Sequence, residues 1–152
     1  MALPNIFSKS VAEEVIQRIE LLLPTAQPLW GTMNAAQMLA HLNVSYEMIF
    51  DNTHAKPGAF MKLILKTLVK KKVVTEVPYP KSSRTAPQFI MTGDKDFDAE
   101  KARLIAFIRQ VQGLGESHFD GKESHSFGAL TINEWNVMMY KHLNHHLSQF
   151  GV

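Results

Sequence analysis

The segment from Thr131 to Phe150 constrains the fold of this chain more than any other stretch. Thr131 and Glu134 have the spacing of a capping box, which begins a helix. At about 100° per residue, one stripe of this helix collects both apolar and polar side chains, namely Trp135, Met139, His142, His146 and Gln149. Such a stripe must be covered by other elements, and imidazoles removed from water need a hydrogen-bond partner or a metal ion.

His142 and His146 are four residues apart, so their rings lie one above the other on the same helix face. This spacing lets one helix offer two ligands to one metal ion. The alternative is that one ring caps a carbonyl and the other lies at the surface of a histidine-rich helix end. His145 falls at the edge of the stripe and is the weaker candidate.

Composition indicates one globular domain over residues 1–152. The chain has 152 residues, of which 45% are hydrophobic, enough for one core. It has no cysteine, so a metal site must use histidine, carboxylate or water, and any thiol must come from a small cosubstrate. No segment reaches the length of a membrane span, and the first residues lack a secretory pattern. We therefore expect a soluble, cytoplasmic protein that does not bind membranes.

Helical periodicity and helix start signals predict an all-α fold. The further helices expected are residues 11–23, 34–50, 57–69 and 94–113. The start signals of the three longer ones are Ser10 with Glu13, Asn34 with Gln37, and Asp94 or Asp96. No strand pair is predicted. The architecture that follows is a four-helix-type bundle with an additional short helix and one long crossover loop.

His41 leans toward the inner side of the helix predicted over residues 34–50, among apolar neighbours. Alone it would be interpreted as a hydrogen-bonded core histidine. Beside an inward histidine pair on another helix, it becomes the natural third ligand of a metal. His118 and His125 fall in a glycine-bearing connection and are interpreted first as loop residues.

The segment Val73–Thr92 contains three prolines and is predicted to be an extended crossing loop. A loop of this length often serves a site, and we expect it to border the open side of the metal. Lys81 and Arg84 could reach an anionic substrate there, and a purely structural crossover is the alternative.

Five lysines, Lys62, Lys66, Lys70, Lys71 and Lys72, make the short helix basic and amphipathic. Such a helix can bind a membrane surface or nucleic acid. However, no aromatic residue interleaves the lysines to stack on bases, and the net charge is only +2. We therefore predict a solvated face and no nucleic-acid binding.

The early run Gln37-Met38-Leu39-Ala40-His41-Leu42, with Trp30, and the late run His142 to Gln149 resemble the DinB/YfiT-like superfamily of metalloenzymes. The resemblance covers nearly the whole chain. It implies a four-helix bundle in which His41, His142 and His146 hold a divalent metal, commonly nickel or zinc. The segment Ser126–Trp135 and the last four residues resemble a branch known mainly as a domain of unknown function.

The resemblance implies a metal-dependent enzyme, because characterised relatives include S-transferases that use bacillithiol or mycothiol and a mycothiol-dependent isomerase. A transferase or hydrolase acting on a small molecule, such as a low-molecular-weight thiol, is therefore expected. Zinc or nickel is the expected metal, with iron and manganese as alternatives, and the chain could form a homodimer. Tyr46, Glu47 and Gln149 are candidates for supporting the ligands or transferring protons. The competing hypothesis is a non-catalytic, stress-related interaction module with a structural or vestigial metal.

Overall fold

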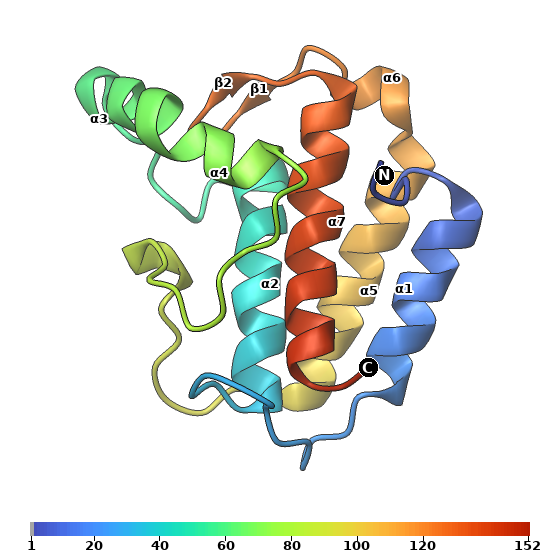
Figure 1. Cartoon of the computed structure of the whole chain (residues 1–152). Helices are drawn as coiled ribbons and strands as arrows, with labels where there is room; N and C mark the ends of the chain where they lie inside the picture. Colours follow the sequence, from blue (N-terminus) through green and yellow to red (C-terminus); the bar gives the residue numbers. More distant parts are fainter. Residues whose placement is uncertain (1) are drawn as a thin grey trace.

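The computed structural model describes residues 2–152, and this part of the chain is mostly helical (Figure 1). Four long helices lie side by side: α1 (Lys9–Leu21), α2 (Ala35–Phe50), α5 (Phe97–Leu114) and α7 (Ile132–Gln149). Each contacts two of the others, in the cyclic order α1, α5, α2, α7. The space between them is filled by buried apolar side chains such as Ile19, Leu42, Leu104 and Leu143. The predicted all-α fold is confirmed.

Two of the predicted capping boxes are present in full. The side chain of Asn34 accepts from the backbone of Gln37, and the side chain of Gln37 accepts from the backbone of Asn34. Thr131 and Glu134 make the same reciprocal pair at the start of α7. These caps satisfy backbone N–H groups that would otherwise lack a partner, and they fix where the two helices begin.

The structure decides three helix ends that the sequence either left open or placed elsewhere. α1 begins earlier, because Ser8 rather than Ser10 caps it by accepting from the backbone of Val11. Asp96, rather than Asp94, caps α5. α5 continues past Gly113 and ends at Gly115, which has a φ of 73°. Such a positive φ favours glycine, whereas a glycine inside a helix is merely tolerated.

The chain between α2 and α5 forms a long crossover. These two helices run in the same direction, so the chain returns along the bundle between them (Figure 1). The crossover contains α3 (Ala59–Ile64), the π-helical turn η1 (Leu65–Val69), α4 (Lys70–Val74) and the short 3-10 helix η2 (Pro87–Phe89). The helix predicted over residues 57–69 therefore extends to Val74 and is irregular at its centre. No helix in the described part of the chain is long and apolar enough to cross a membrane.

The helical part of the crossover leaves apolar side chains exposed. Phe60, Leu63 and Leu68 are 76%, 58% and 68% exposed, so they do not cover the core as helical periodicity suggests. Of the five lysines predicted to form a solvated face, Lys66, Lys71 and Lys72 are exposed. Lys62 and Lys70 are half-buried, and they form ion pairs with Glu123 and Glu134. The π-helical turn changes the phase of the apolar stripe, because it adds a residue to one turn of the helix.

A two-stranded antiparallel sheet precedes α7, although no strand pair was predicted. It joins β1 (Glu123–Ser124) to β2 (Gly128–Ala129), and the hydroxyl of Ser124 donates to the carbonyl of Gly128 at 2.8 Å. Strands of two residues are too short to show an alternating pattern in the sequence. The helical turn α6 (Glu116–Phe119) lies just before the hairpin.

Candidate metal centre

Three histidines from two neighbouring helices meet between α2 and α7. One ring nitrogen from each of His41, His142 and His146 lies within 4.8 Å of the other two, and the group could hold a metal ion. The ring centroids are 4.5 to 5.0 Å apart. The structure therefore brings together the residues that the sequence selected from two separate helices.

Burial differs among the three rings. His41 is 5% exposed and His146 is 8% exposed, whereas His142 is only partly buried. His142 and His146 are one helical turn apart on α7, so neighbouring elements need not cover the two rings equally. His142 is therefore the least covered of the three residues, although both of its ring nitrogens have partners.

Two of the rings have a fixed tautomer. His41 Nδ1 lies 2.8 Å from the carbonyl oxygen of Phe89, and His146 Nδ1 lies 2.7 Å from Gln149 Oε1. The amide orientation of Gln149 is defined because its Nε2 donates to the carbonyl of Trp30. Both partners of the rings are acceptors, so each Nδ1 carries the proton and each Nε2 keeps a free lone pair.

The third ring has a partner that can serve either tautomer. His142 Nδ1 lies 2.9 Å from Ser45 Oγ, and a hydroxyl can donate or accept. His142 Nε2 lies 3.0 Å from His41 Nε2, so one proton must lie between these nitrogens when no cation does. In the metal-free protein, His142 therefore donates to His41 and accepts from Ser45. With a cation in place, the proton of His142 would face Ser45 and all three Nε2 lone pairs would be free.

The electrostatic environment keeps the three imidazoles neutral. Burial is the largest cause that lowers the pKa of each ring, and the neighbouring histidines lower it further. The pKa of His146 falls to about 3, and that of His142 falls well below its ordinary value. Neutral imidazole is the form that binds metals, so burial prepares the ligands before any ion arrives.

The crossing segment borders the cluster, as its length suggested. The ring of Tyr79 lies 6.4 Å from His142 and 5.6 Å from His145, measured between centroids. The ring of Phe89 lies 5.3 Å from His41 and 5.8 Å from His142. These aromatic side chains cover the partly open side of the three histidines.

Lys141 fastens this segment to α7. Its Nζ, which is buried, donates to the carbonyls of Lys72, Thr75 and Val77, and it lies 4.4 Å from the centre of the Tyr79 ring. Burial lowers the pKa of Lys141 to about 8. The carbonyl oxygens accept from the ammonium, and they hold the segment in place beside the cluster.

Several candidates from the sequence lie elsewhere. Glu47 pairs with His54 and Arg103 on the outer side of α2. Tyr46 stacks on Phe107, away from the cluster. Of the three residues proposed to support the ligands, only Gln149 touches one.

His118 and His125, which the sequence placed in a loop, are not part of the cluster either. His118 Nε2 accepts from Lys122, and His125 contacts Ser126 Oγ and the backbone carbonyl of His54. The interpretation as a loop residue is confirmed for His125, which lies between β1 and β2, but it is wrong for His118, which lies in the helical turn α6.

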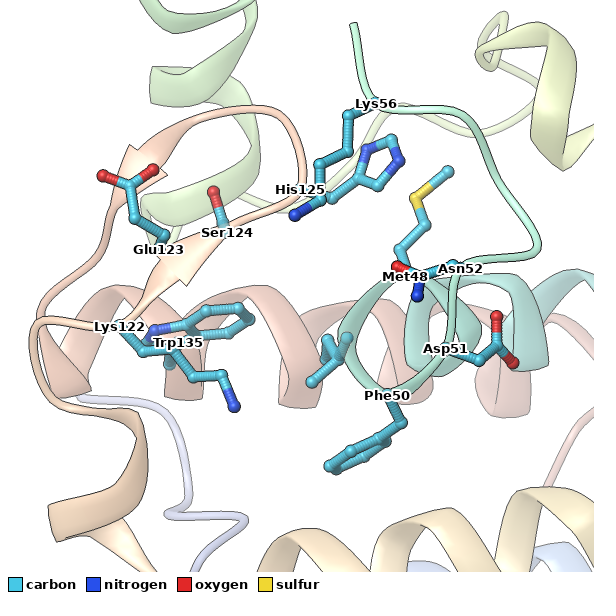
Figure 2. A pocket seen from close by; sticks show the side chains of 11 residues that line it. Met48, Phe50, Asp51, Asn52, Lys56, Lys122, Glu123, Ser124, His125 and Trp135 are labelled. Atoms are coloured by element: carbon cyan, nitrogen blue, oxygen red, sulfur yellow. The ribbon is translucent and has the colours of Figure 1, made fainter.

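A pocket of about 190 Å³ lies at the other end of the bundle, between the end of α2 and the hairpin (Figure 2). Its wall includes both acidic and basic groups, among them Asp51, Lys56, Lys122 and Glu123. None of the three clustered histidines lines it. Trp135, on its wall, is seven residues from His142, or roughly 10 Å along α7.

Comparison with known proteins shows a family match over most of the chain. Residues 8–151 match the model of a family described as "protein of unknown function (DUF1569)". The chain belongs to this family. No curated protein and no solved structure matches the chain. The DUF1569 match spans the crossover and both helices that carry the histidines, but its description assigns no chemistry.

Proposed function

We propose that this DUF1569 protein binds one divalent metal ion, zinc or nickel, through the Nε2 atoms of His41, His142 and His146. We further propose that its bundle is of the DinB/YfiT type. One observation carries the proposal: the Nδ1 atom of each ring, on its outer side, has a hydrogen-bond partner. The three Nε2 atoms, on the inner side, can therefore direct their lone pairs at one point. Partners on the outer nitrogen are what metal-binding histidines need, because they fix the tautomer and the ring orientation.

Three protein ligands would leave a position open for a small molecule, because structural zinc sites usually have four. A divalent cation held there would lower the pKa of a coordinated thiol or water and supply the nucleophile near neutral pH. The chain itself keeps the imidazoles neutral, orients them through Gln149 and Phe89, and shields one side with aromatic rings.

We favour transfer of a small thiol over hydrolysis. In the described chain, no carboxylate hydrogen-bonds to any of the three histidines, so the site lacks the general base that hydrolysis of a stable substrate commonly uses. A thiol needs less help, because its pKa is already near 8.5. In the transfer, the thiol proton passes to solvent. The sulfur then forms a bond to an electrophilic carbon, and the leaving group departs with the bonding electron pair.

The competing proposal is a non-catalytic metal-binding module, and the same lack of a nearby carboxylate is compatible with it. Metal analysis and a thiol-transfer assay separate the two. A catalytic site should bind one ion per chain and conjugate a small thiol to an electrophile such as a chlorodinitrobenzene. A non-catalytic module should bind the ion, but the conjugation rate with the protein should equal the rate with the free metal ion alone.

The ligand assignment is tested by single substitutions. His142→Ala should reduce metal content to a small fraction of one ion per chain, because two imidazoles rarely hold zinc or nickel firmly. His145→Ala is the matched control, since this ring lies in the same turn of α7 but outside the cluster. Full metal content in the His142→Ala protein, measured after dialysis, would contradict the assignment.

A further inference from the structure

Hydrogen-bond donors gather beside the metal centre without acceptors. Lys81 Nζ lies 4.4 Å from the centre of the Trp30 ring, and that ring lies 5.7 Å from the ring of His145. His145 in turn lies 4.9 Å from His146, measured between ring centroids. A continuous row of side chains therefore leads from Lys81 to the three histidines.

None of these donors is used within residues 2–152. Lys81 takes part in no ion pair, and the ring nitrogens of His145 make no hydrogen bond. The indole N–H of Trp30 is shielded from solvent and also meets no acceptor. Of these groups, only the indole N–H of Trp30 is buried, and a buried donor without an acceptor is costly. An acceptor from outside the chain would remove this cost.

The charge around the cluster has one sign. Within residues 2–152, no carboxylate forms an ion pair with Lys81 or a hydrogen bond with His145. The hydrogen-bond partners of Nδ1 in the three clustered histidines are a backbone carbonyl, a hydroxyl and a side-chain amide, all of them neutral. A divalent ion held by three neutral imidazoles would add two further positive charges. None of the partners described for these histidines carries a negative charge to balance them, so a bound anion is favoured by electrostatics.

Gln149, which orients His146, also holds Trp30 in place. Gln149 Nε2 donates to the carbonyl of Trp30 at 2.6 Å, while Gln149 Oε1 accepts from His146. The next residue, Gly31, has a φ of 81°, and a Cβ there would lie 2.7 Å from Gln149 Nε2. A side chain at Gly31 would therefore displace the Gln149 amide that ties Trp30 to the three histidines.

We propose that Lys81, His145 and Trp30 form a subsite for a carboxylate, so that the small thiol bound at the metal centre is an anionic one. This inference rests on the proposed function. A single ammonium with neutral N–H donors matches one negative charge, whereas a phosphate dianion would call for more cationic groups. The carboxylate lies beside the Trp30 ring and accepts from Lys81, while the thiol group of the same molecule reaches the three histidines.

The test compares two thiols that differ only in the charged group. Cobalt-loaded protein is titrated with mercaptohexanoate and with mercaptohexanol, and binding is followed by the thiolate-to-cobalt absorption band. The acid should bind about tenfold more tightly than the alcohol, the size of one charge-assisted hydrogen bond. Lys81→Met should remove this preference and leave the affinity for the alcohol unchanged, whereas Lys81→Arg should retain most of it.

The controls separate the subsite from the metal centre. Lys9→Met removes an exposed lysine from α1 and should keep the full preference. The cobalt spectrum without thiol shows whether each variant still folds and binds the ion. An equal preference in the Lys81→Met and unaltered proteins, or no preference in the unaltered protein, would overturn the subsite while leaving the metal proposal intact. If neither thiol alters the cobalt spectrum, the proposed function fails and this inference fails with it.

Discussion

At the scale of single residues, hydrogen bonds to the outer ring nitrogens decide what the histidines can do. A neutral imidazole offers a lone pair on only one nitrogen, and the partner of the other nitrogen determines which one. Phe89 and Gln149 supply acceptors, which point the lone pairs of His41 and His146 inward. Ser45 gives His142 a partner in either tautomer, so metal binding requires only a rotation of one hydroxyl and the shift of one proton.

Gln149→Leu should weaken metal binding by about 10- to 100-fold, the usual effect of removing a partner of a metal-binding histidine. The substitution leaves all three ligands in place but removes the acceptor that fixes the tautomer of His146. Competition with a chromogenic chelator would measure the affinity. Ser148→Ala is the matched control, because the exposed side chain of Ser148 contacts Arg18 and no histidine. Equal affinities of the Gln149→Leu and Ser148→Ala proteins would contradict the role given to Gln149.

At the scale of elements, the crossover differs most from expectation. Its prolines predict an extended path, and the structure agrees, but its helical part presents Phe60, Leu63 and Leu68 to solvent. Periodicity assigns apolar residues to one face without saying whether another element covers that face. The same segment places Tyr79 and Phe89 against the three histidines, so its path over the bundle matters more for the site than its secondary structure does.

Lys141→Met should loosen the crossover without unfolding the bundle. The substitution keeps a long apolar side chain on α7 but removes the ammonium that binds three backbone carbonyls of the segment. Limited proteolysis should cut within residues 73–92 several-fold faster than in the unaltered protein, because local opening controls access to the protease. Lys9→Met should be cut at the unaltered rate. Unchanged cleavage in the Lys141→Met protein would show that other contacts hold the segment.

At the scale of the whole molecule, the buried histidines link stability to pH. Free imidazole has a pKa near 6.5, so histidines in an unfolded chain take up protons near that pH. In the folded protein, burial lowers the pKa of all three rings, that of His146 to about 3. The three histidines of the folded protein therefore take up protons at lower pH than the same histidines do in the unfolded chain.

The metal-free protein should lose stability as the pH falls below about 6.5. Between the unfolded and folded pKa values, the unfolded chain binds more protons, so the free energy of unfolding decreases as pH decreases. Each histidine can contribute up to about 1.4 kcal/mol per pH unit in that window, and the contribution is fully present above it. Urea denaturation at several pH values would measure the slope. His146→Gln should reduce it, and an unchanged slope would contradict the assignment of this effect to the cluster.

The sequence by itself determined the features that depend on spacing within one helix. Two capping boxes, the inner stripe of α7 and the inward positions of His41, His142 and His146 all follow from neighbours a few residues apart. The tertiary structure alone decided which distant groups complete the site. Phe89 is 48 residues from His41, and Trp30 is 119 residues from Gln149. The physical reason is that a backbone carbonyl carries no signature in the sequence, and its position depends on the path of the whole crossover.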